Sequence, residues 1–115
     1  MEIMQDVYVE NKIIGQKSSQ KTAGTQSVNL DSKDLLVIAK ALSSSTRITI
    51  LKLLNEEEMD VSKIASRLEQ TEANISAQIA ILQKAKLVTC AYQPGGHGVR
   101  KVCRLNANEL LIQLF

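Results

Sequence analysis

The segment that most constrains the fold of this chain runs from Val61 to Val88 and reads VSKIASRLEQTEANISAQIAILQKAKLV. Apolar residues recur at helical spacing in both halves of it, which predicts two short helices with one buried face each. These residues are Ile64, Ala65 and Leu68 in the first half and Ile75, Ile79 and Leu82 in the second. Only Glu69-Gln70-Thr71 separates the two halves, so the connection must be tight. The Thr71 hydroxyl is placed to cap the second helix by accepting from the Asn74 amide.

Two short helices joined by a tight turn form the helix-turn-helix pattern, in which the second helix enters the DNA major groove. A β-hairpin is predicted directly after it, with strands at Val88–Gln93 and Val99–Leu105. The intervening PGGHG has three glycines after a proline, which favours a hairpin connection. The order of elements predicts an α+β, mainly helical winged helix-turn-helix with a two-stranded wing.

Further helices are predicted on either side of this unit. Hydrophobic residues make up 44% of the 115 residues but only three are aromatic, a composition that favours helices over a β-sandwich. One helix is expected from Asp31 to Leu42, capped by Asp31 or Ser32. Another is expected at roughly Thr46–Asn55, with Ile48, Leu51 and Leu54 as its buried stripe. The last segment, Ala107–Phe115, is too apolar for a free tail and is predicted to form a short helix packed on the first one, within the chain or across a dimer.

The N-terminal residues give weaker signals. Residues 1–14 mix apolar and polar side chains without a period and could form a short strand, a partner-binding arm or nothing. Residues 15–29 are rich in Ser, Gln, Thr, Lys and Gly, which is typical of a linker or tail. We therefore expect a flexible or partner-ordered tail over residues 1–29 and a winged helix-turn-helix domain over residues 30–115.

The distribution of charge is more informative than the net charge of +2. The segment from Lys84 to Arg104 has five basic residues and no acidic one, whereas acidic residues cluster between Glu56 and Asp60. This predicts a basic edge beside an acidic loop. With no secretory signal, no apolar run of membrane-spanning length and only two cysteines, the sequence predicts a cytoplasmic protein without a membrane partner.

Several segments resemble the ArsR-type winged helix-turn-helix repressors. They are IAKALSSSTRITILKLL from Ile38, VSKIASRL from Val61, NISAQIAILQKAKLV from Asn74 and the glycine-containing wing, so that the resemblance covers about residues 31–115. It implies a transcriptional regulator, usually a repressor, that binds double-stranded DNA. It also implies a homodimer, which we expect to form through the Asp31–Leu42 and Ala107–Phe115 helices and to place two recognition helices one helical turn apart on a palindromic operator.

The chain departs from the family pattern at four places. The Cys-x-Cys pair of the metal-sensing branch corresponds to Met59–Ser62, which has no thiol, so that metal site is absent and no cofactor is expected. Glu69 and Lys86 stand at turn positions where the family commonly has Gly and positive φ, at a cost of about 1 kcal/mol each. Ala77 replaces a large basic or imidazole side chain.

Residues predicted to contact DNA from the second helix lie on its exposed N-terminal half: Thr71, Glu72, Asn74, Ser76, Ala77 and Gln78. Asn74 and Gln78 are one turn apart, and an amide can form two hydrogen bonds with adenine N6 and N7, while Glu72 can accept from cytosine N4. The alternative is an ordinary polar helix surface used for protein contact.

The wing and the basic edge are expected to supply affinity through Lys84, His97, Arg100 and Lys101. Bare glycines at the tip allow backbone amides and Arg100 to approach phosphates or the minor groove. The glycines also serve simply to turn the hairpin.

Cys90 and Cys103 have residue numbers that sum to 193, as do all pairs placed symmetrically about the Gly96-His97 midpoint. In that register the two thiols are cross-strand neighbours within disulfide range, which makes a redox switch in the wing one hypothesis. The other is that both are ordinary filler, because free cysteine is often buried. A zinc site with His97 is disfavoured by the length of strand between the tip and the thiols.

No arrangement of residues indicates an enzyme. Two alternatives to a DNA-binding regulator remain: a winged helix that serves as a protein-interaction module in a larger assembly, and a redox-gated DNA-binding sensor that uses the wing cysteines.

Overall fold

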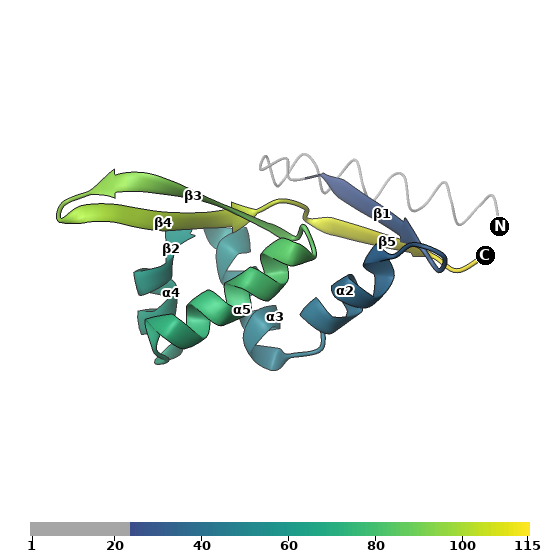
Figure 1. Ribbon diagram of the computed structural model, residues 1–115, viewed down its shortest axis with the longest axis horizontal. Coiled ribbons are helices and arrows are strands. Elements are labelled where there is room, and N and C mark those ends of the chain that lie inside the picture. Colours follow the sequence, from purple (N-terminus) through teal and green to yellow (C-terminus); the bar gives the residue numbers. More distant parts are fainter. Residues whose placement is uncertain (1–23) are drawn as a thin grey trace.

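The structure is a computed structural model that describes residues 24–115 (Figure 1). Within this range, four helices lie against two small sheets, and the hairpin of the larger sheet extends well past the helices. The elements, in chain order, are β1 (Thr25–Asn29), α2 (Asp34–Ala41), α3 (Ser45–Glu56), β2 (Met59–Asp60), α4 (Val61–Leu68), α5 (Glu72–Lys84), β3 (Val88–Gly95), β4 (Gly98–Leu105) and β5 (Glu109–Gln113). This is the α+β winged helix-turn-helix that the sequence predicts.

The two sheets have different architectures. β2, β4 and β3 form an antiparallel sheet in that order, and β1 pairs with β5 in parallel as a separate two-stranded sheet. β2 is only two residues long, with Met59 opposite Cys103 and Asp60 opposite Val102. It therefore ties the segment before α4 to the base of the wing.

The core is aliphatic and draws on every helix. Its fully buried side chains are Ile38 of α2, Ile50 of α3, Ile64 of α4 and Ile75, Ile79 and Leu82 of α5, with Met59 and Cys103 from the sheet. The buried faces predicted for α4 and α5 are confirmed, except that Leu68 is only half-buried. On α3 the predicted stripe is partly wrong, because Ile50 and Arg47 are buried beside Leu54 whereas Ile48 and Leu51 are half-buried.

The prediction of a short C-terminal helix is wrong. Residues 109–113 form β5, which pairs in parallel with β1 from Thr25 opposite Glu109 to Asn29 opposite Gln113. The Gly24 carbonyl accepts from the amides of Asn108 and Glu109, which starts the pairing. A strand is formed here because its backbone groups find partners at the far end of the chain, which a local pattern does not reveal.

Residues 25–29 belong to the folded domain rather than to the predicted tail. They form β1, inside the segment 1–29 that the sequence assigns to a tail, and Val28 is buried in the core. The two β-branched residues of β1 are enough for a five-residue strand once β5 lies beside it. The expectations for residues 1–23 lie outside the described residues.

The remaining boundaries are close to prediction. α2 begins at Asp34 rather than Asp31, and neither predicted cap occupies its N-cap position, although the Ser32 hydroxyl accepts from the Asp34 amide at 3.1 Å. Both turn residues that replace family glycines are confirmed at positive φ, 57° for Glu69 and 63° for Lys86.

Candidate nucleic-acid interface

The turn between α4 and α5 is held by caps at both helix starts. The Asp60 carboxylate accepts from the Lys63 amide at 2.7 Å and begins α4. The Thr71 hydroxyl accepts from the Asn74 amide at 3.0 Å and begins α5, as predicted. Between them, Glu69 takes the left-handed conformation and allows the Gln70 amide to donate to the Ala65 carbonyl at 3.0 Å. These bonds satisfy helix-end groups that otherwise lack partners, so the orientation of α5 is set locally.

The outward face of α5 carries smaller side chains than the sequence predicts. Of the predicted contact residues, Thr71, Glu72, Asn74 and Ala77 are exposed, whereas Ser76 and Gln78 are half-buried on its flanks. The face opposite Ile75, Ile79 and Leu82 instead carries Ala73, Ala77, Ala80 and Lys84, all exposed. Ala73 and Ala80 were missed because alanine suggests core or propensity rather than contact. The helical period itself was the signal that could have found them.

Three amide side chains form a line along one flank of α5. The Gln78 amide nitrogen donates to the Asn74 side-chain oxygen at 3.4 Å, and the Asn74 amide nitrogen donates to the Gln70 side-chain oxygen. At the buried end of this line, Arg47 Nη1 of α3 donates to Gln78 Oε1 at 2.6 Å. Sequence reasoning missed Arg47 because an isolated arginine in an amphipathic helix is normally assigned to the solvent-exposed face.

Arg47 is the only buried charged residue in the part of the chain that the structure describes, with 8% of its surface exposed. Besides Gln78, its guanidinium donates to the Ala41 carbonyl at 2.9 Å and the Lys40 carbonyl at 2.7 Å, at the C-terminal end of α2. Carbonyls at a helix end lack intrahelical partners and are favourable sites for a cation. One side chain therefore joins the ends of α2 and α3 to the recognition helix.

Glu72 is oriented toward the first helix of the motif. The Ser62 hydroxyl of α4 donates to its Oε2 at 2.9 Å. The carboxylate retains acceptor capacity, because each oxygen has two lone pairs. Glu72 lies in the exposed first turn of α5, where the partial positive charge of the helix N-terminus stabilises its carboxylate.

The wing is a long hairpin with the register that the sequence predicts. β3 and β4 pair from Val88 opposite Leu105 to Gly95 opposite Gly98, which leaves only Gly96 and His97 as the loop. Gly98 has φ 120°, a conformation that glycine adopts without strain. His97 at the tip is exposed, and no group of His, Cys, Asp and Glu that could hold a metal occurs within residues 24–115.

Arg100 is turned back onto the domain. Its Nη1 lies 2.9 Å from Asp60 Oδ2, and the two side chains are 52% and 16% exposed, respectively. A Cβ placed on Gly95 would lie 2.7 Å from Arg100 Cγ, so the absence of a side chain at Gly95 makes room for the arginine stem. Arg100 thus pairs with the residue that caps α4, while Lys84 is exposed and Lys101 is half-buried.

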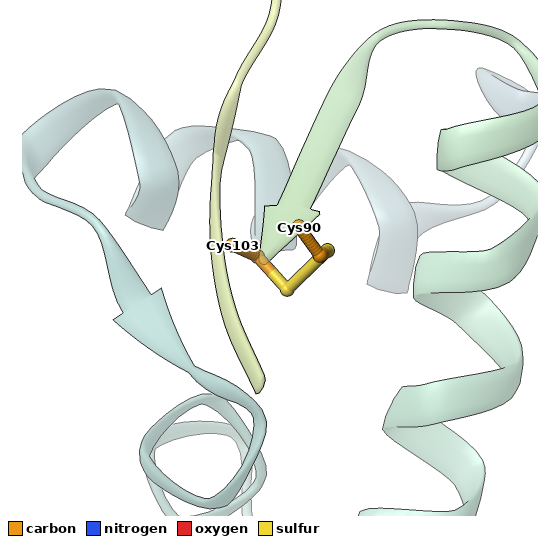
Figure 2. The surroundings of a disulfide bond; sticks show 2 residues. All are labelled: Cys90 and Cys103. Carbon is orange, nitrogen blue, oxygen red and sulfur yellow. A yellow bond between two sulfur atoms is a disulfide. The ribbon is translucent and has the colours of Figure 1, made fainter. Parts of the chain in front are cut away.

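Cys90 and Cys103 face each other across the base of the wing and form a disulfide, shown in Figure 2. Their Cα atoms are 4.1 Å apart, and they are paired residues in the strand register, as the sum of their numbers predicted. Cys103 is fully buried and Cys90 is half-buried against the core. The bond lies where the exposed hairpin joins the packed domain.

The matched family and the similar structures agree with this geometry. The family described as bacterial regulatory protein, arsR family, matches residues 44–89, which span α3 to the start of β3. A search of curated proteins finds no match to this chain. No helix within residues 24–115 is both long and apolar enough to cross a membrane.

Two solved structures illustrate the similarity. The homodimeric winged helix-turn-helix DNA-binding domain Mb0332 from Mycobacterium bovis, a possible ArsR-family transcriptional regulator, is 27% identical with a TM-score of 0.55, over 64% of this chain and 64% of that one. HlyU from Vibrio cholerae is 25% identical with a TM-score of 0.56, over 69% of this chain and 82% of that one. Proteins of this family and fold are transcriptional regulators rather than enzymes. Residues 44–89 of the chain therefore match the arsR family of bacterial regulatory proteins, and its fold is similar to the winged helix-turn-helix of solved transcriptional regulators.

Proposed function

We propose that this protein is a homodimeric transcriptional repressor that recognises a specific double-stranded DNA sequence. The observation that carries the proposal is the joint presentation of two elements. The N-terminal end of α5 and the tip of the wing project toward the same end of the molecule (Figure 1). A helix for the major groove beside a hairpin for the adjacent backbone is the arrangement by which a winged helix binds DNA.

The two elements would divide the work of binding. Alanine methyl groups on the outer face of α5 allow the helix to enter the groove closely and can contact thymine methyls. Polar residues on its flanks, with Asn74 and Gln78 foremost, would form hydrogen bonds to bases or phosphates. Basic side chains at Lys84 and Lys101 would neutralise phosphates, and His97 and the bare wing tip would lie along the backbone.

The dimer interface is proposed on α2 and the β1–β5 sheet. Large apolar side chains are exposed on these elements and on the residues next to them: Leu30, Leu36, Leu111, Ile112, Leu114 and Phe115. Exposed apolar side chains concentrated on a few elements mark an interaction surface more often than a free one. Mb0332, which has the same fold, is homodimeric, so a second copy of the chain is the proposed occupant.

DNA binding is tested by fluorescence anisotropy of the protein on a mixed-sequence duplex over a salt series. We expect affinity to fall steeply, with a log-log slope of several units, as phosphate contacts release counterions. Lys101→Ala should reduce the slope by about one unit. Flat or absent binding at low salt would favour a protein-interaction module in a larger assembly, with an acidic partner for the basic edge.

The dimer is tested by sedimentation or light scattering at micromolar concentration. The wild type should have the mass of two chains, and Leu111→Glu should have the mass of one, because a charge on a buried dimer face loses its solvation. Val99→Glu, which places the same charge on an exposed apolar residue of the wing, is the matched control and should stay dimeric. A wild type that is monomeric at all concentrations would remove the dimer from the proposal.

A second candidate function is a redox-gated DNA-binding regulator, and the wing disulfide is the observation that favours it. A dithiol reductant supplies two electrons and two protons to convert the Cys90–Cys103 disulfide into two thiols, and is itself oxidised to a disulfide. Because the bond lies at the base of the wing, its reduction would loosen the hairpin that contacts the backbone. Anisotropy of the oxidised and reduced protein on one duplex tests this, with Cys90→Ser as the control that must not respond to reductant. Equal affinities of the two redox forms would exclude redox gating.

A further inference from the structure

The hydrogen bonds of Arg47 determine which way the Gln78 side chain presents its amide. Arg47 is buried, and each of its three guanidinium nitrogens donates one hydrogen bond: Nε to the Ala41 carbonyl, Nη1 to Gln78 Oε1 and Nη2 to the Lys40 carbonyl. A guanidinium has donors and no acceptor. The atom of Gln78 that lies 2.6 Å from Arg47 Nη1 must therefore be the amide oxygen, and the amide NH₂ must point to the other side.

The other side of Gln78 faces the exposed flank of α5. There the NH₂ donates one hydrogen to Asn74 Oδ1 at 3.4 Å, and the Asn74 NH₂ donates in turn to the Gln70 side-chain oxygen. Each NH₂ has two hydrogens; those of Gln78 and Asn74 use one within this line, and that of Gln70 uses neither. Each amide oxygen already accepts a bond from the preceding member. The groups of these three amides that remain available to a DNA groove are therefore mainly hydrogen-bond donors.

This polarity conflicts with the adenine contact expected from the sequence. Bidentate reading of adenine needs the same amide to accept from N6–H through its oxygen and to donate to N7 through its nitrogen. The Gln78 oxygen is held by a charge-assisted bond inside the domain, which is stronger than an ordinary amide bond. Acceptor-rich base edges, guanine N7 and O6 or thymine O4, match the donors that remain.

We propose that Arg47 is a positioning residue that fixes Gln78 as a hydrogen-bond donor, so that α5 reads guanine or thymine at the position facing Gln78 rather than adenine. This inference rests on the proposed function, because it assumes that α5 lies in the major groove. Arg47 contacts no DNA in this account and acts only through Gln78.

The Arg47–Gln78 bond is tested first without DNA. In ¹H–¹⁵N spectra of the full-length protein, Gln78→Met should shift the Arg47 guanidinium resonances and increase their exchange with solvent. Gln83→Met, the same substitution later on the same helix, should leave the Arg47 resonances unchanged. Guanidinium resonances of Arg47 that are identical in the wild type and in Gln78→Met would overturn the proposal, since the bond would not exist in solution.

Base reading is tested by selecting duplexes from a randomised pool with the wild type, then measuring anisotropy with every base pair at each half-site position. We expect one position to prefer guanine or thymine by about three- to tenfold, the effect of one hydrogen bond, and to lose this preference in Gln78→Met but not in Gln83→Met. Arg47→Lys, if folded, should relax the same position without touching the others. The proposal would be overturned if the wild type preferred adenine at this position through the adenine N6 amine, and if Gln78→Met lost that preference.

The outcomes separate this inference from the proposed function. A wild type that selects a sequence while Gln78→Met keeps every preference overturns the role of Gln78 alone. A wild type that binds without sequence preference also overturns the role of Gln78, and of the proposed function it leaves only non-specific DNA binding. A wild type that binds no duplex at low salt overturns the proposed function and this inference together.

Discussion

The recognition helix and the wing are both exposed to DNA in the proposed complex, but the domain supports them in opposite ways. α5 buries three aliphatic residues completely and is tied to two other helices through one arginine. The wing is mostly exposed beyond its base, where the Cys90–Cys103 disulfide joins its two strands, and closer to its tip Arg100 pairs with Asp60 of the domain. In the proposed complex, the rigid element would read bases and the adaptable one would contact the backbone. The predictions below test that contrast.

The largest effect is expected on the helix side, from Arg47→Met. The variant keeps the apolar stem but leaves the Ala41 carbonyl and the Gln78 oxygen without this donor, whereas the Lys40 carbonyl still accepts from the amide and hydroxyl of Ser43. Buried unpaired polar groups of this kind should lower the free energy of unfolding by about 3 kcal/mol. Urea unfolding followed by circular dichroism measures it, and a loss under about 1 kcal/mol would show that the arginine is not needed to fix α5.

Reduction of the disulfide is expected to affect the wing most. Loss of a cross-link between residues 13 apart should lower stability by about 2 kcal/mol, because the unfolded chain regains loop entropy. Amide hydrogen exchange should accelerate near the tip, between Tyr92 and Lys101, while the amides of α5 stay protected. Equal acceleration in α5 and the wing would mean that the two regions are one cooperative unit and would break the comparison.

Asp60 connects the two regions, since one carboxylate caps α4 and pairs with Arg100 of the wing. Asp60→Ala removes both and should destabilise by about 1.5 kcal/mol, most of it from the cap. Asp60→Asn keeps a capping oxygen and loses the ion pair, so its cost should stay under about 1 kcal/mol. Thermal unfolding of the two variants separates the contribution of the cap from that of the ion pair. An equal loss of stability in both variants would assign the effect to the ion pair instead.

The smallest effect is a gain in stability at the turn that sets the angle of α5. Glu69→Gly should stabilise by about 0.5 kcal/mol, because glycine adopts the left-handed conformation without a Cβ penalty, although it adds entropy to the unfolded chain. Arg67→Gly, two residues earlier and inside α4, should destabilise by about 1 kcal/mol. A loss of stability in Glu69→Gly would show that the turn is not strained.

Much of the molecule could be predicted from local pattern because its determinants lie close together in sequence. The Thr71 cap, the buried faces of α4 and α5 and the strand register of the wing all depend on residues within one turn or one hairpin of each other. The positive φ of Glu69 and Lys86 was expected from the family resemblance instead. Near neighbours close short loops at little entropic cost, so tertiary structure rarely overrides them.

The candidate site was predicted less completely. Its exposed residues on α5 were largely found from the helical period, but half-buried Gln78 was assigned a free amide, and Arg100 a free guanidinium. Each of these two side chains has its partner on another element, Arg47 on α3 and Asp60 ahead of α4. A one-dimensional pattern shows that a polar side chain is available and does not show what it meets.

The sequence by itself determined the helix-turn-helix and the wing, and placed the two cysteines opposite each other in the hairpin register while leaving open whether they are bonded, because periodicity, caps and hairpin symmetry are local properties. Only the tertiary structure decided that the last segment is a strand rather than a helix, since ELLIQLF suits either form and its choice depends on β1, 84 residues away in register. Only the tertiary structure, likewise, decided that a buried arginine of α3 donates to a side chain of the recognition helix. Both outcomes depend on contacts between distant segments, which exist only once the chain has folded.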